Sequence, residues 1–233
     1  MTAGRRATTA PACCRLTPWQ GEGRGEVILD PFCGSGTILT EAALMGYKNL
    51  IGSDISDKAL QATKTNIAWL QSNFQLSTFN FQLFHSDATQ ISKQIAPNSI
   101  DAIITEPYLG PQRGRIEINK IKLELEKLYS ESLREFSKIL KPSGRIVMIW
   151  PVFQMSSGAI SFPSFPRRRE SRNSFSENTL HPNLDGFKII NPIPANLRKN
   201  IWLKLTERNT IIYGREGQKI WREIVVLKKQ IKK

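Results

Sequence analysis

The residues best suited to bind a small ligand lie at positions 30–37, which read Asp-Pro-Phe-Cys-Gly-Ser-Gly-Thr. An apolar run precedes them and a helical pattern follows, so they form a strand-to-helix loop. Glycines let backbone approach a ligand closely, and a helix N-terminus offers unpaired N–H groups. The next apolar segment, residues 49–53, ends at Asp54, and an acid there can bind both hydroxyls of a ribose. The glycines alone fit a tight turn, but the whole series predicts a nucleoside cofactor.

These motifs also carry a family resemblance. Residues 30–37 and the Gly-Ser-Asp at 52–54 resemble the first two motifs of class I S-adenosylmethionine-dependent methyltransferases. The sequences at 31–33 and 37–42 are closest to THUMP-associated tRNA guanine-N2 methyltransferases acting on guanosine 10, and residues 211–224 resemble their last hairpin. The resemblance spans about residues 26–153 and 185–229. It implies S-adenosyl-L-methionine as cofactor, bound by Asp30, Pro31, Phe32, Gly34, Gly36, Thr37, Asp54, Ile55, Asp87 and Ala88.

Three acids among these residues have distinct implied roles. Asp30 would contact the methionine ammonium group, Asp54 the ribose, and Asp87 the adenine amine. Asp87 also fits a turn acid before a helix. Cys33 fits a small packing residue better than a nucleophile, because no base accompanies it in the sequence.

The segment Thr105-Glu106-Pro107-Tyr108 follows another apolar run and stands where related amino-methyltransferases carry their catalytic motif. A base amine is a weak nucleophile because its lone pair is delocalised, so an acceptor must draw on its N–H bonds while an aromatic ring stacks on the base. Pro107 stiffens the turn and Tyr108 can supply the ring. Thr105 takes the usual acceptor position, whereas Glu106 is the stronger acceptor and a possible base. The alternative is a strand end whose Glu faces solvent.

Strands alternate with helices along the chain, which predicts an α/β fold with a doubly wound, mostly parallel, Rossmann-like sheet and an antiparallel C-terminal strand. Residues 141–144 should end the third helix. The expected helices cover 38–45, 56–75 and 120–140, and the expected strands cover 26–29, 49–53, 79–84, 100–104, 145–150, 187–193, 210–213 and 221–227.

Two segments depart from this alternation. Residues 1–25 are irregular, so the methyltransferase domain is expected over 26–233. Residues 156–178 lack periodicity and resemble peptides encoded by mobile repeats, which predicts a disordered insertion. A basic RNA-contacting arm is the alternative for this insertion.

Charge is distributed unevenly over the 233 residues, whose formal net charge is +13. Residues 1–110 hold 8 Lys/Arg and 9 Asp/Glu, whereas residues 111–233 hold 25 and 11. This asymmetry suits a polyanionic substrate such as RNA, most specifically tRNA. A generally basic surface is the plainer explanation.

The sequence shows no secretory signal and no apolar run of membrane-spanning length. Its three cysteines, at 13, 14 and 33, have no metal-ligand spacing. We therefore expect a cytoplasmic protein with reduced thiols and without a metal site.

Several functions remain open at this point. The resemblance implies methyl transfer to an exocyclic base amine of RNA, most specifically guanine N2 in tRNA. The THUMP module and an upstream helix that normally closes the cofactor pocket are both missing, which indicates a fragment, a partner protein that supplies these parts, or lost activity. The alternatives are a DNA adenine-N6 methyltransferase and an inactive nucleic-acid-binding remnant. A NAD-dependent dehydrogenase fits least, because the loop lacks Gly-x-Gly-x-x-Gly.

Overall fold

A mixed sheet flanked by helices dominates the computed structural model, which describes residues 25–74, 79–111, 117–153, 179–191, 193–194, 197, 205–206, 208–215 and 218–230. The expectations for residues 1–24 and for the insertion at 156–178 lie outside these ranges. The elements are β1 (Val27–Asp30), α1 (Thr37–Leu44), β2 (Asn49–Asp54), α2 (Asp57–Asn73), β3 (Asn80–His85), the 3-10 helix η2 (Ala88–Lys93), β4 (Ile100–Thr105), α3 (Ile118–Ile139), β5 (Leu140–Phe153), β6 (Phe187–Ile190), β7 (Ile211–Tyr213) and β8 (Ile220–Lys229).

The strands follow the order β3-β2-β1-β4-β5-β8-β6, and β7 also pairs with β8. Strands β1 to β5 are parallel to their neighbours. Strand β8 runs antiparallel to β5 on one edge and to both β6 and β7 on the other. The predicted fold class is confirmed, and the predicted antiparallel hairpin at 210–227 is present as β7 and β8.

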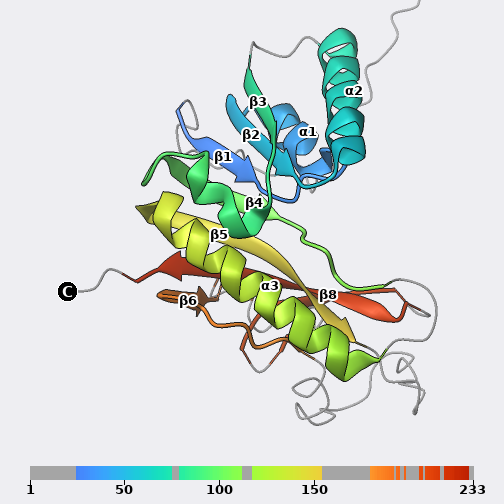
Figure 1. The fold of residues 1–233 in the computed structure, drawn as a ribbon, viewed down its shortest axis with the longest axis vertical. Helices are drawn as coiled ribbons and strands as arrows, with labels where there is room; N and C mark the ends of the chain where they lie inside the picture. Colours follow the sequence, from blue (N-terminus) through green and yellow to red (C-terminus); the bar gives the residue numbers. More distant parts are fainter. Residues whose placement is uncertain are drawn as a thin grey trace, which may run out of the picture.

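Helices cover both faces of the sheet, as alternation along β1 requires. Ile28 belongs to an apolar cluster with α1 and α2, whereas its neighbour Leu29 belongs to a larger cluster with η2 and α3. Figure 1 shows α1 and α2 grouped beside β2 and β3, while α3 lies across β5 and β8. The protein is thus doubly wound, with a core on each side of the sheet.

A side-chain cap begins α2, and a buried apolar face holds α3 against the sheet. Ser56 caps α2 by accepting a hydrogen bond from the Ala59 N–H at 3.3 Å. Along α3 the buried side chains recur at helical spacing and include Leu125, Leu133 and Phe136. No described helix combines the length and apolar character needed to cross a membrane.

The segment 141–144 does not separate α3 from a strand that begins at Arg145, so that predicted boundary is wrong. Strand β5 begins at Leu140, which pairs with Ile100, and a register shift then precedes the pairing of Ala102 with Arg145. Lys141 Nζ also donates to both carboxylate oxygens of Asp101, at 2.7 and 2.8 Å. These contacts hold the turn residues against β4 as an irregular part of the strand.

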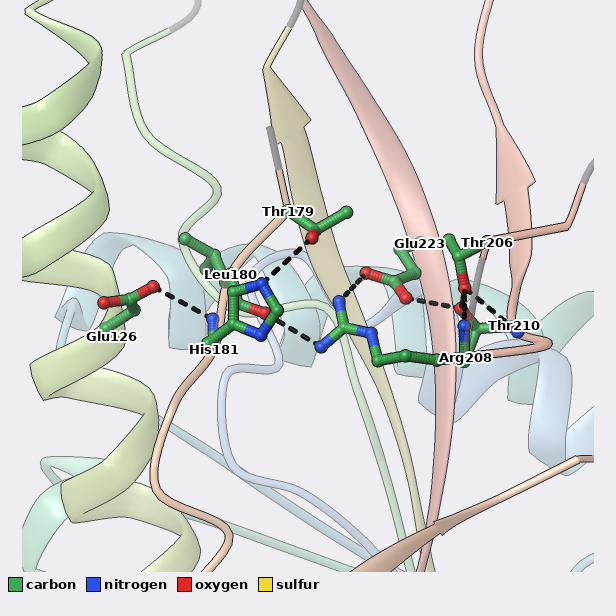
Figure 2. A network of polar contacts seen from close by, with 8 residues as sticks. All are labelled: Glu126, Thr179, Leu180, His181, Thr206, Arg208, Thr210 and Glu223. Carbon is green, nitrogen blue, oxygen red and sulfur yellow. Dashed lines mark hydrogen bonds and ion pairs between the residues drawn. The ribbon is translucent and has the colours of Figure 1, made fainter. Parts of the chain in front are cut away.

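A buried polar network fastens the C-terminal strands to the body of the protein (Figure 2). Glu223 on β8 is fully buried and pairs with Arg208, whose Nη2 lies 2.7 Å from its Oε2. The same guanidinium group donates to the Leu180 carbonyl at 2.9 Å and lies 5.1 Å from the centroid of the Trp150 ring. Thr210 also donates to Glu223. One arginine thus joins three segments that are distant in sequence.

Candidate active site

The candidate site lies at the carboxyl edge of the parallel strands. The chain connects β1 to β2 on one side of β1, whereas β4 pairs with its other side. Such a reversal of strand order opens a crevice at the carboxyl ends of the strands, where open α/β sheets bind ligands. The segments leaving β1, β2, β3 and β4 carry the residues singled out in the sequence.

The glycine loop is held by hydrogen bonds on several sides. Cys33 N–H donates to the Ser53 carbonyl at 2.9 Å, and Gly36 N–H donates to the Cys33 carbonyl at 2.7 Å. From α2, the Thr63 hydroxyl donates to the Gly34 carbonyl at 2.8 Å. Gly36 has a φ of 83°, and a Cβ there would meet Thr63 Cγ2 at 2.7 Å. The loop is therefore held in place without a ligand. Gly36 is needed because its conformation and the nearby Thr63 leave no room for a side chain.

Asp54 links the glycine loop to the start of α2. Its Oδ2 accepts from Gly34 N–H at 2.9 Å, and its Oδ1 accepts from Ser56 N–H at 2.9 Å. Each carboxylate oxygen can accept more than one hydrogen bond, so both keep acceptor capacity. The half-buried carboxylate is thus positioned to bind further donors.

Asp30 is almost wholly buried, with 1% of its surface exposed, and Oδ1 accepts from the Thr105 hydroxyl at 2.7 Å and from Phe32 N–H at 3.2 Å. Burial raises the pKa of this carboxyl to about 7, and the nearby charges of Asp54 and Glu106 raise it further. The two hydrogen bonds act in the opposite direction. A buried acid with this pKa favours a cationic partner, which would hold it ionised.

Two adjoining cavities open around these residues. The first, of about 460 Å³, is lined by Asp30, Phe32, Cys33, Gly34, Ser35, Thr37, Ile38, Glu106, Pro107, Tyr108, Leu109, Gly110 and Arg222. The second, of about 420 Å³, is lined by Pro31, Phe32, Gly34, Asp54, Ile55, Ser86, Asp87, Ala88, Glu106, Pro107, Tyr108 and Leu128. The residues common to both are Phe32, Gly34 and 106–108, so the two motifs meet between the cavities.

The segment after β4 presents one acidic and one aromatic side chain to both cavities. The Tyr108 side chain is largely exposed, while its carbonyl accepts from the buried Tyr129 hydroxyl of α3 at 2.8 Å. Burial raises the pKa of Tyr129, so its hydroxyl stays protonated and remains a donor. Glu106 Oε1 accepts from Arg222 Nε at 2.8 Å. The backbone is thereby held while the side chains face the cavities.

Most of the sequence-predicted site residues line the cavities, and two do not. Gly36 shapes the loop from behind, and Thr105 is buried with its hydroxyl directed to Asp30. Asp87 lines the second cavity and also caps η2, since its Oδ1 accepts from Thr89 N–H at 2.9 Å. Cys33 packs in the apolar cluster beside α1, and burial raises its thiol pKa to about 12. The assigned roles stay predictions.

Sequence reasoning missed two lining residues from distant elements. Leu128 lies on α3, where its periodicity marks only a core-facing position. Arg222 lies on β8, and nothing in the sequence near it indicates a contact with Glu106. Pairing of β8 with β5 brings it to the site, which no local pattern encodes.

Comparisons with known proteins agree with this architecture. A family model described as UPF0020, the RMKL-like methyltransferase domain, matches residues 1–178. The tRNA (guanine(10)-N2)-dimethyltransferase of Methanothermobacter thermautotrophicus is 34% identical over 127 residues, which are 54% of this chain and 33% of that protein. The U6 snRNA (guanine-N(2))-methyltransferase THUMPD2 of Bos taurus is 30% identical over 151 residues, which are 64% of this chain and 26% of that protein. The matches thus span about a third or less of these relatives.

Solved structures share the fold. A SAM-dependent methyltransferase from Methanosarcina mazei superposes with a TM-score of 0.53 at 18% identity, covering 90% of this chain and 95% of that one. TrmN from Thermus thermophilus gives a TM-score of 0.51 at 22% identity, covering 88% of this chain and 44% of that one.

Proposed function

Because the chain belongs to the RMKL-like methyltransferase domain family, we propose that it transfers a methyl group from S-adenosylmethionine to an exocyclic base amine of RNA, most specifically guanine N2 in tRNA. One observation carries the proposal: Glu106, Pro107 and Tyr108 line both cavities at the point where they meet. An acceptor and an aromatic ring therefore stand beside the space proposed for the cofactor, where a base could be received. The curated relatives named above are RNA guanine-N2 methyltransferases, which favours this substrate class.

The residues present fit S-adenosylmethionine. The second cavity suits the nucleoside half, with Asp54 for the ribose, Asp87 for the adenine amine, and Ile55, Ala88 and Leu128 as apolar walls. Asp30 in the first cavity suits the methionine ammonium group, because burial of this carboxylate is offset by a bound cation. When bound, the cofactor supplies a methyl group on a sulfonium centre.

Glu106 is the better acceptor of the two proposed from the sequence. The Thr105 hydroxyl is buried and already donates to Asp30, so Thr105 positions the cofactor-binding acid. Glu106 reaches the cavities and has a carboxylate oxygen, Oε2, with no hydrogen bond from any described residue. This oxygen can accept a hydrogen bond from the amine N–H group. It can then accept the proton that the methylated amine releases. Tyr108 supplies the stacking ring for the base.

The RNA-contacting surface is proposed to lie beside the first cavity. The hairpin of β7 and β8 brings Arg215 toward the carboxyl end of β5, since β7 pairs with β8 at Arg222, and Arg222 pairs in register with Pro151. The exposed Arg215 can bind a phosphate that flanks a flipped base. We also propose that the protein is cytoplasmic and acts on tRNA there. A partner protein would add RNA-binding surface.

Methyl transfer with radiolabelled cofactor tests the proposal. The protein is incubated with unmodified tRNA transcripts, ribosomal RNA and DNA, and the products are digested for nucleoside mass spectrometry. We expect N2-methylguanosine in tRNA, and binding that weakens steeply with salt. Label found as N6-methyladenine in DNA would replace the substrate assignment.

Calorimetry with S-adenosylhomocysteine separates a failed substrate from a failed cofactor site. Asp54→Ala should weaken binding roughly ten-fold or more, because it removes a charge-assisted hydrogen bond. Leu123→Ala, an exposed change on α3, is the control and should leave affinity unaltered. Normal cofactor binding without transfer to any nucleic acid would favour the inactive remnant.

A further inference from the structure

The ion pair between Glu106 and Arg222 joins the proposed acceptor to a residue that has no role in the reaction described above. A single hydrogen bond joins them, from Arg222 Nε to Glu106 Oε1 at 2.8 Å. Both side chains are partly exposed, at 31% for Arg222 and 40% for Glu106. Among described residues, neither side chain makes a second hydrogen bond or ion pair, so one oxygen of the carboxylate is held and Oε2 stays available.

The two partners come from parts of the chain that differ in strand pairing. Glu106 lies in the segment just after β4, which has no strand pairing. Arg222 lies within β8, where its backbone is paired with Pro151 of β5 on one side and Tyr213 of β7 on the other. A site group is held best when its partner projects from a rigid element. The strand therefore anchors the loop side chain.

The charges around the pair also favour this arrangement. Asp30 and Glu106 both line the first cavity, and Asp54, Asp87 and Glu106 line the second. Among the residues that the structure describes, Arg222 is the only basic one in either lining. The Glu106 charge acts unfavourably on Asp30. Without Arg222, the acidic residues would repel Glu106 toward solvent.

We propose that Arg222 is a positioning residue, which holds the Glu106 carboxylate in the cavity with Oε2 free to accept the base amine. This inference rests on the proposed function, since it specifies how the acceptor of that reaction is oriented. It assigns a reaction role to a residue on the antiparallel strand β8, remote in sequence from both motifs. Arg222 acts through Glu106 and makes no contact with the base.

A double-mutant cycle measured under single-turnover conditions tests this role. Arg222→Met should reduce the methyl-transfer rate roughly ten- to hundred-fold, the value of a charge-assisted hydrogen bond. Affinity for S-adenosylhomocysteine should be unchanged. In the Glu106→Gln background, Arg222→Met should have no further effect, because the carboxylate that it positions is gone. Arg222→Lys, which keeps the charge, should recover part of the rate.

Lys228→Met is the matched control, because it removes one positive charge from an exposed position of the same strand. It should leave the transfer rate at the wild-type level. If Glu106→Gln is inactive, the cycle is measured by guanosine binding in the presence of S-adenosylhomocysteine.

Three results would overturn the inference. A wild-type rate in Arg222→Met would show that the pair is dispensable. Equal losses in both backgrounds, with the salt slope reduced by about one, would instead make Arg222 a phosphate-binding residue. If the wild type transferred no methyl group to RNA, the proposed function itself would fail. The radiolabelled transfer assay described above detects that outcome separately.

Discussion

Asp30 gives the site a pH dependence that can be measured without turnover. Its pKa of about 7 means that the carboxyl is largely protonated below neutrality in the ligand-free protein. A bound ammonium group favours the charged form, so binding should release a proton. We expect affinity for S-adenosylhomocysteine to rise with pH, up to about ten-fold per unit between pH 5.5 and 7 and to level off above 7. Calorimetry in buffers of different ionisation enthalpy measures both quantities.

Two comparisons assign this effect to Asp30. In Asp30→Asn the pH dependence should disappear, because the amide does not titrate. For the wild type, 5′-methylthioadenosine lacks the amino acid group and should bind with little pH dependence. An equal slope for both ligands would place the titrating group elsewhere.

Gly36 is expected to be the least replaceable residue of the loop. Gly36→Ala adds a Cβ at a φ of 83° and 2.7 Å from Thr63 Cγ2, whereas Gly46→Ala adds one at a φ of 91° in open space. Gly46→Ala should cost about 1–2 kcal/mol of unfolding free energy through backbone strain alone, and Gly36→Ala should cost more. Urea denaturation measures both. Adding Thr63→Ser to Gly36→Ala removes the crowded methyl group and should recover part of the loss.

For single residues, the sequence predicts chemistry that depends on neighbours along the chain. It does not predict contacts between residues that are distant in sequence. The loop glycines and Asp54 could be identified because their types and spacing imply the loop and the strand end. Thr105 could not be assigned to Asp30, because the two residues lie in different strands and meet only when β1 pairs with β4. The ordering of Thr105 and Glu106 as acceptors therefore needed the structure.

Among the elements, the attachment of β7 and β8 depends on the Arg208–Glu223 pair. Arg208→Met would leave Glu223, which is fully buried, without its counter-ion. Removing one partner of a buried pair typically costs about 3–5 kcal/mol. The control is Lys141→Met, which breaks the more exposed pair with Asp101 and should cost about 1 kcal/mol or less. Similar small losses in both variants, measured by denaturant unfolding, would show that Arg208 is replaceable.

Element identity was largely predictable, whereas several boundaries and the extent of one short helix were not. The three α-helices follow a strong apolar period and the short strands follow apolar runs. The turn signal at Lys141–Gly144 failed because pairing of β5 with β4 overrides it. The 3-10 helix η2 was anticipated only through Asp87 as a turn acid before a helix. Its extent was not predicted, because it is too short for a period and packs on α3 through tertiary contacts.

For the whole molecule, the insertion expected at residues 156–178 is a prediction that can be tested by deletion. It lies between β5 and β6, and residues 179–181 on its far side join the polar network of Arg208. Replacing 156–178 with a short Gly/Ser linker should leave the melting temperature and cofactor affinity nearly unchanged, because loop closure depends weakly on length. Thermal unfolding and calorimetry check this. A large fall in melting temperature would show that the segment packs as part of the domain.

The place of β8 within the sheet dictates an order of folding. Among the described strands, β6 and β7 pair with the sheet only through β8, so neither can join it until β8 has bound β5. Closing the long loop between β5 and β8 is slow compared with local helix formation. During that interval β5 would present an open strand edge bearing Ile146, Met148 and Trp150, the kind of edge through which chains aggregate. Substitutions that slow the docking of β8 would therefore lower the yield of refolding before they lower the stability of the native protein.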